Sequence, residues 1–222
     1  IDIGGESTRP GAFPVSADEQ LRRILPVISA VRTRPISIDT TLSAVIWAIA
    51  DSGAAPIIND VSAGTDDPAM LALAGRLACP IILMHRPGPS ATMQDHPQYE
   101  DVVAEVCAFL EQRLQAAIQA GVNREMVLLD PGIGFGKTME HDLALLRAIP
   151  KLKAIGQPIV IGVSRKKFIG RLTGQTEAAE RVFGTAAAVA WSVANRADVV
   201  RVHDVAAMVQ VVRVAAALKR QD

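Results

Sequence analysis

The chain is organised around Leu128-Leu129-Asp130-Pro131-Gly132-Ile133-Gly134-Phe135-Gly136-Lys137, where an apolar run ends in a carboxylate and a glycine-rich turn. A buried strand that stops at Asp130 explains this order, because Pro131 cannot donate to a sheet. The glycines then let the backbone turn tightly and approach a ligand. The turn fits neither nucleotide-binding motif: a Walker A loop requires glycine at position 131, and the dinucleotide fingerprint requires a different glycine spacing. We interpret Asp130 as an acid facing a pocket; the alternative is that it only caps the turn.

The composition indicates one α/β domain over residues 1–222, since 222 residues of which 50% are hydrophobic suffice for a single core. A formal net charge of +0 argues against binding to nucleic acid or to an anionic membrane surface. The two cysteines, Cys79 and Cys107, have the spacing of neither a disulfide framework nor a zinc site. We therefore expect reduced thiols and a cytoplasmic protein.

Short apolar runs alternate with helical patterns along the whole chain. The expected strands are continuous apolar runs, as in sheets buried on both faces, and cover 1–3, 36–38, 57–58, 80–84, 126–129, 159–162 and 199–202. Ser16 with Glu19 predicts a capping box for a helix ending near Val31, and Ser43 predicts the cap of the next helix. The remaining helices are expected over 68–78, 101–120, 141–153, 177–195 and 205–220.

This alternation predicts an α/β fold with a parallel sheet, either doubly wound or closed into a barrel. A complete (β/α)8 TIM barrel takes about 250 residues. Seven units in 222 residues therefore lead us to expect a barrel whose first β/α unit precedes Ile1. The strand that starts the chain would then be the second of eight.

Polar side chains follow every expected strand, at the end where parallel barrels place their ligand sites. They are Gly4 to Arg9, Asp39-Thr40, Asn59-Asp60, His85-Arg86, Asp130, Ser164 to Lys167, and Arg201 with His203-Asp204. The acceptors among them suit the N–H edge of a heterocycle, and the cations suit phosphate or carboxylate groups. The sequence thus indicates an enzyme whose pocket holds a heterocycle beside an anion.

Less specific interpretations stay open for several of these side chains. A strand-end aspartate could form a structural ion pair with Lys166, and we interpret His85 as a neutral core histidine. Arg9 could lie exposed on a mobile loop. Lys167 could face solvent, because three adjacent cations cannot all point inward.

Several motifs in a fixed order resemble those of bacterial dihydropteroate synthases, and the similarity extends from Ile1 to about Ala217. The motifs are Gly4-Gly5-Glu6-Ser7-Thr8-Arg9-Pro10-Gly11, Ser37-Ile38-Asp39-Thr40, Ile58-Asn59-Asp60, Leu83-Met84-His85, Leu129 to Lys137, Ser164-Arg165-Lys166 and Arg201-Val202-His203-Asp204. The resemblance implies a TIM barrel that joins 6-hydroxymethyl-7,8-dihydropterin pyrophosphate to p-aminobenzoate in folate synthesis, with release of pyrophosphate. This family is also the target of sulfonamides.

The resemblance also implies roles for individual residues. Asp39, Asn59, Asp130 and Lys166 would bind the pterin, and Val61, Met84 and Gly162 would line its ring. Arg201 and His203 would hold the pyrophosphate, Thr8 and Arg9 would belong to a mobile loop, and Phe135 with Lys166 would flank p-aminobenzoate next to the Ser164 motif. The catalytic set is thus Lys166, Arg201, His203 and Arg9. Where the family often has a serine to meet the p-aminobenzoate carboxylate, this chain has Lys167.

The resemblance further implies Mg²⁺, whose asparagine ligand in the family lies on the strand expected before Ile1, and a homodimer formed through late helices. Two other functions compete with the synthase. One is a methyltetrahydrofolate-binding barrel that serves a corrinoid methyltransferase, which would not need the cationic motifs at Ser164 and Arg201. The other is a truncated, non-catalytic pterin binder, although every motif quoted above is intact.

Overall fold

The computed structural model describes residues 1–8, 11–31 and 33–219. Its first five strands form one parallel sheet in chain order: β1 (Asp2–Gly4), β2 (Ser37–Asp39), β3 (Ile57–Asp60), β4 (Ile81–Met84) and β5 (Val127–Asp130). β6 (Val160–Ile161) and β7 (Val199–Val200) form a second parallel pair. A bridge between Leu129 and Ile159 connects the two sets. The predicted parallel α/β arrangement is confirmed, with all seven expected strands present.

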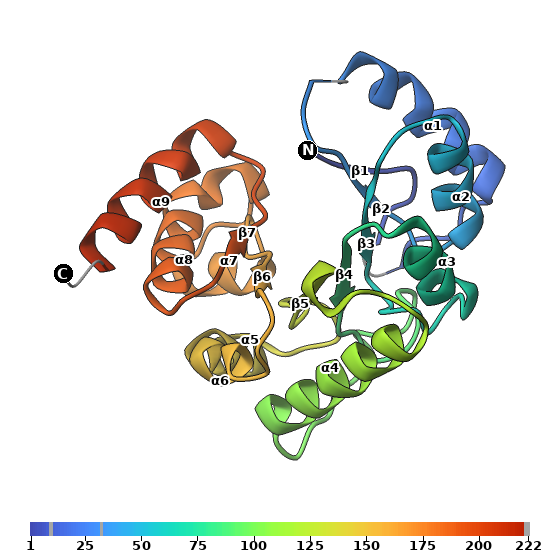
Figure 1. Cartoon of the computed structure of the whole chain (residues 1–222). Coiled ribbons are helices and arrows are strands. Elements are labelled where there is room, and N and C mark those ends of the chain that lie inside the picture. Colours follow the sequence, from blue (N-terminus) through green and yellow to red (C-terminus); the bar gives the residue numbers. More distant parts are fainter. Residues whose placement is uncertain (9–10, 32, 220–222) are drawn as a thin grey trace.

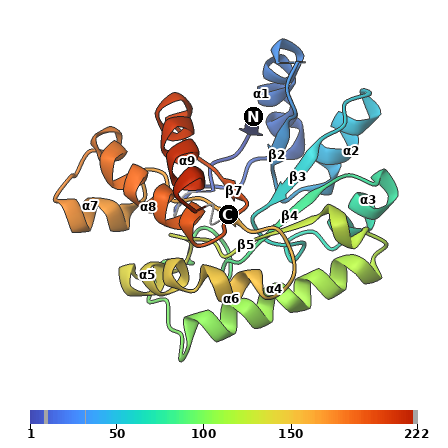
Figure 2. The ribbon, with the colours of Figure 1, turned by 60° about the vertical axis from the view of Figure 1, so that its left-hand side comes forward.

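The helices follow one another around the outside of the strands, from α1 to α9 (Figure 1, Figure 2). They are α1 (Ala17–Ala30), α2 (Ser43–Asp51), α3 (Ala69–Leu77), α4 (Val102–Gln119), α5 (Met139–Arg147), α6 (Ile149–Lys153), α7 (Lys167–Thr173), α8 (Val182–Ala194) and α9 (Val205–Lys219). Two 3₁₀ helices, η1 (Arg124–Met126) and η2 (Ala178–Arg181), precede β5 and α8. Among the described residues, no helix has both the length and the apolar character needed to cross a membrane.

The central residues of the first five strands are apolar because both faces of the sheet are covered there. Ile38, Ile58, Ile81, Leu83 and Leu129 have no exposed surface. Strands buried on both faces read as continuous apolar runs, which is why the sequence located them. The core therefore fills the space between strands and helices and holds the carboxyl ends of the strands in fixed positions.

The ends of the sheet meet through a side chain. In the part of the chain described, β7 and β1 are not paired. Arg201, directly after β7, instead donates from Nε to Asp2 Oδ2 of β1 at 2.6 Å. This contact brings the last and first strands to the same site.

Two of the predicted helix caps differ from the structure. Ser16 Oγ accepts from the backbone N–H of Glu19 at 3.4 Å, but the Glu19 carboxylate binds Arg22 and Arg23, so only half of the capping box forms. The prediction for Ser43 is wrong, because Ser43 is the first residue of α2 and donates its N–H to Asp67 Oδ2 at 2.8 Å. At Ser16 two arginines take the carboxylate that the capping box would use, and at α2 the Asp67 carboxylate accepts an N–H group at the helix start.

Two helical predictions were also incomplete. The stretch 141–153 forms two helices, α5 and α6, with Pro150 at the start of the second. The short helix α7 was not predicted, because its seven residues are too few for a clear apolar stripe.

Candidate active site

The sheet register places the predicted acceptors side by side. Asp39 at the end of β2 is the partner of Asn59 in β3, and Met84 at the end of β4 is the partner of Asp130 in β5. Asp39, Asn59 and Asp130 are all buried, with 8%, 6% and 7% of their surface exposed. Buried polar groups are almost always hydrogen-bonded, so three of them at one edge indicate a site built for a partner.

Asp39 holds an unsatisfied oxygen. Among the described residues its buried Oδ1 has no hydrogen-bond partner, whereas Oδ2 accepts from Arg201 at 3.4 Å. Burial, together with the nearby Asp2 carboxylate, raises the pKa of Asp39 to about 7, against the opposing effect of Arg201. An acceptor left without a donor inside the protein is suited to a ligand that brings an N–H group.

Asp130 both caps the turn and faces the site. Its Oδ1 accepts from the N–H of Gly132 at 2.7 Å, so the turn-capping alternative is correct for this oxygen. Burial raises the pKa of Asp130, although the Gly132 N–H, Lys166 and Arg201 each favour its charged form. Gly132 has φ +70°, and a Cβ there would lie 1.9 Å from His85 O, so only glycine allows this turn.

Lys166 lies between the acceptors and an aromatic ring. Its Nζ stands 4.2 Å from the centroid of the Phe135 ring, a cation–π distance. Burial lowers the pKa of Lys166 to about 8, while Asp130 and Asp142 oppose that shift. Across the described part of the chain, Lys166 forms no ion pair within 4.0 Å, so its ammonium is available to a ligand.

Arg201 spans two carboxylates, one of which the sequence analysis missed. Besides Asp39 it binds Asp2, whose carboxylate also accepts from Asn59 Nδ2 at 3.3 Å. Asp2 thus connects the acceptor group to the cationic group across β1, β3 and β7. Its position inside the first strand gave no signal, because a ligand site in a parallel barrel is expected at residues that follow strand ends.

Ser164 and His203 form the other part of the cationic end. Ser164 Oγ accepts from the His203 backbone N–H at 3.1 Å and lies 2.9 Å from His203 Nδ1. Arg165, which the sequence analysis grouped with these cations, instead donates to Asp204 at 2.6 Å. Arg165 has a left-handed backbone, with φ +59°, and its guanidinium is paired with Asp204, which lies between β7 and α9.

A family profile described as "Pterin binding enzyme" matches residues 1–203. The chain belongs to the pterin binding enzymes. The dihydropteroate synthase of Synechocystis sp. is 47% identical over 223 residues, which cover 99% of this chain and 77% of that protein.

Solved structures give the same family and the fold. A Yersinia pestis dihydropteroate synthase with a sulfonamide drug complex has a TM-score of 0.93 and 36% identity, covering 99% of this chain and 80% of that chain. A Xanthomonas albilineans dihydropteroate synthase with 4-aminobenzoic acid has a TM-score of 0.92 and 43% identity, covering 100% of this chain and 79% of that chain. Within the pterin binding enzymes the chain is therefore grouped with the dihydropteroate synthases, transferases with the TIM-barrel fold.

Three residues are expected to line the pterin ring: Val61, Met84 and Gly162. Val61 and Met84 are 3% and 4% exposed. A Cβ at Gly162 would meet nothing within 4 Å, so open space lies above this backbone. Thr8 lies in the loop after β1, and Arg9 falls outside the described residues.

His85 and Asp60, at two further strand ends, serve the scaffold of this pterin binding enzyme. Burial and the neighbouring Lys137 lower the pKa of His85 to about 3, which favours a neutral ring. Asp60 has no exposed surface and accepts from Ser62 and Gly64, so its carboxylate holds the loop after β3.

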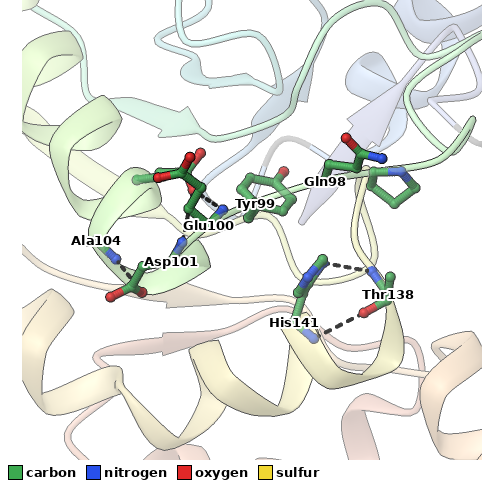
Figure 3. Close-up of a pocket in the computed structure, with 9 residues that line it drawn as sticks. Gln98, Tyr99, Glu100, Asp101, Ala104, Thr138 and His141 are labelled. Atoms are coloured by element: carbon green, nitrogen blue, oxygen red, sulfur yellow. Dashed lines mark hydrogen bonds between the residues drawn. The ribbon is translucent and has the colours of Figure 1, made fainter.

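One surface groove among the described residues is separate from these side chains. It has a volume of about 880 Å³ and is lined by residues from Pro97 to Glu105 together with Thr138 and His141 (Figure 3). None of the predicted site residues lines it. The groove adjoins the glycine-rich turn through Tyr99, whose hydroxyl donates to Gly136 O at 3.0 Å.

Proposed function

We propose that the strand-end acceptors and cations form a single dihydropteroate synthase site in one domain spanning residues 1–222. The observation that carries the proposal is Arg201, which joins the carboxylates of Asp2 and Asp39. Through Asp2 the same network reaches Asn59. The groups suited to a heterocycle are thus in direct contact with a group suited to a diphosphate.

The pterin is the ligand for the acceptors. Its aminopyrimidine edge presents several N–H donors, which match Asp130 and Asn59 and the unsatisfied Oδ1 of Asp39. Burial raises the pKa of Asp39 and of Asp130, because their charged forms are poorly solvated inside the protein. A ligand that donates N–H groups would stabilise those charged forms. Val61, Met84 and Gly162 then contact the faces of the ring.

The pyrophosphate is the ligand for Arg201 and His203, with Ser164 orienting the His203 ring. Arginine binds phosphate oxygens in a bidentate manner, so Arg201 would exchange Asp2 and Asp39 for the diphosphate. Thr8 and Arg9 complete this end from the loop after β1.

Mg²⁺ is the cofactor we expect with the diphosphate. In the described part of the chain, no cluster of three or more His, Cys, Asp or Glu side chains could hold a metal alone. Mg²⁺ commonly uses one or two carboxylates plus substrate phosphates and water, and the Asp2 carboxylate beside Arg201 fits that donor set. When bound, the ion would neutralise charge on the leaving pyrophosphate.

The chemistry needs charge stabilisation rather than a strong base. Departure of pyrophosphate, assisted by Arg201 and His203, breaks the bond to the pterin methylene carbon, and the ring shares the resulting positive charge. The neutral amine of p-aminobenzoate attacks that carbon and then loses a proton. Phe135 and Lys166 flank the aminobenzoate ring, and its carboxylate meets either the Lys167 ammonium or the Lys167 backbone N–H.

Two substitutions test this assignment. Asp130→Asn should abolish binding of the pterin pyrophosphate, because the amide replaces one acceptor oxygen with an NH2 donor that would face an N–H group of the pterin. Arg201→Ala should weaken binding of the pyrophosphate substrate at least tenfold and change binding of the pterin alone much less. Calorimetric titration measures both, with methyltetrahydrofolate as a control ligand. Wild-type affinity of either variant for pterin pyrophosphate would refute the site.

A homodimer and a cytoplasmic location complete the proposal. Late helices carry exposed apolar side chains, among them Phe183 of α8 at 86% and Val214 of α9 at 60%. Both cysteines are free thiols, as in a reducing compartment. Sedimentation showing a monomer at micromolar concentration would refute the dimer.

A further inference from the structure

Lys137 is a buried cation to which the mechanism above gives no role. It closes the glycine-rich motif, and only 5% of it is exposed. Burial lowers the pKa of Lys137 to about 7, although Asp142 and Asp130 favour its charge. Burying an ammonium costs free energy, so a position that only filled the core would favour an apolar side chain.

The ammonium of Lys137 binds the turn that precedes it. Nζ donates to Phe135 O at 2.9 Å and lies 3.0 Å from His85 Nδ1. Since His85 is neutral, its Nδ1 can accept this second bond. Lys137 therefore ties the backbone of Phe135 to the residue that follows β4.

Other side chains hold the neighbouring residues of the same turn. The N–H of Gly134 donates to Asp142 at 2.7 Å, and Gln94 donates to Gly134 O at 2.9 Å. Tyr99, which lines the groove of Figure 3, donates to Gly136 O at 3.0 Å. Gly134 and Gly136 are thus bound through their backbone by side chains from outside the turn, and Lys137 binds the backbone of Phe135 between them.

The turn in its bound form sets the place of Lys166. The Phe135 ring lies under the Lys166 ammonium at 4.2 Å. A Cβ at Gly134 would lie 3.0 Å from Lys166 Cδ, so the turn also packs against the stem of that side chain. A shift of the Phe135 backbone would therefore move both walls of the space between Phe135 and Lys166.

We propose that Lys137 is a positioning residue for the p-aminobenzoate subsite. It holds the Phe135 carbonyl and thereby fixes the Phe135 ring against Lys166. The inference rests on the proposed function, which assigns these two side chains to p-aminobenzoate. Lys137 itself lies behind the turn and does not touch the substrate.

The test is steady-state kinetics of Lys137→Met, which keeps the length and volume of the side chain but removes its donors. The KM for p-aminobenzoate should rise at least fivefold, with the KM for pterin pyrophosphate changed less than twofold. Lys151→Met, on the exposed surface of α6, is the matched control and should leave both constants unchanged. Equal changes in both KM values, or no change, would overturn the proposal.

A double-mutant cycle separates positioning from general stability. If Lys137 acts through the ring, Phe135→Ala should itself raise the KM for p-aminobenzoate, and adding Lys137→Met should raise it less than twofold further. Additive effects of the two substitutions would overturn the proposal. Wild-type enzyme that shows no dependence on p-aminobenzoate would overturn the proposed function as well, so the two failures are distinguishable.

Hydrogen exchange of the wild-type protein gives a test that does not depend on folding of a variant. The amides of Gly134 and Phe135 donate to Asp142 and Gly132 O, respectively, and should exchange as slowly as amides of the neighbouring strand β5. Exchange at the rate of an exposed loop would show that the turn is not held and would overturn the role of Lys137.

Discussion

Replacing Asp39 with asparagine should stabilise the ligand-free protein while removing its affinity for the pterin. The Asp39 carboxyl is buried at the end of β2, and one of its oxygens has no partner among the described residues. Burial and the Asp2 carboxylate raise its pKa from 3.8 to about 7. The folded state therefore disfavours the charge that substrate binding requires, a trade-off common at active sites.

The magnitude follows from the shift in pKa. One pKa unit corresponds to about 1.4 kcal/mol, so at pH above 7 the Asp39 charge costs the folded state about 4 kcal/mol. Below pH 3.8 both the folded and the unfolded chain carry the proton, and this cost disappears. Between these limits the folded state binds more protons, so the Asp39 contribution makes stability fall as pH rises. Asparagine removes that dependence, although its buried amide adds a penalty of about 1–3 kcal/mol that does not vary with pH.

The assay is urea unfolding at pH 5 and pH 8, followed by the fluorescence of Trp47 and Trp191. The free energy of unfolding of Asp39→Asn relative to wild type should increase by roughly 2.5 kcal/mol between these two pH values. Asp51→Asn, on the exposed surface of α2, is the matched control and should show no such change. The reasoning is refuted if the difference between Asp39→Asn and wild type is the same at both pH values.

Two further substitutions test the scaffold. Gly132→Ala should destabilise the protein by more than about 3 kcal/mol. The φ of +70° at Gly132 is unfavourable for alanine, and a Cβ there would lie 1.9 Å from His85 O. A thermal melt within a few degrees of wild type would contradict this prediction. Asp101→Ala should cost about 1 kcal/mol by removing the cap that binds the N–H groups of Val103 and Ala104, and Asp101→Ser should recover most of it in urea unfolding. Equal losses in the two Asp101 variants would show that the cap is unimportant.

Much of the fold could be predicted from the sequence because it depends on neighbours along the chain. The strands around Ile38, Ile58 and Leu129 are short apolar runs, and burial on both faces produces that pattern wherever the strands lie. Polar residues such as Asp39 and Asp130 end these strands. Their position at one common edge could be predicted, because parallel strands present their carboxyl ends together. Helix caps were less predictable. At the start of α2 the N–H group of Ser43 donates to Asp67, which is distant in sequence.

The sequence by itself thus determined the alternation of strands and helices, the end of the sheet where the chemistry lies, and the family. Only the tertiary structure decided which side chains meet there. Asp2 joins Asn59 and Arg201, and Lys137 reaches His85, through contacts between residues far apart in the chain. Apolar patterning records whether a residue is buried. It does not record which distant group lies opposite, because that depends on how the helices pack the strands around a common core.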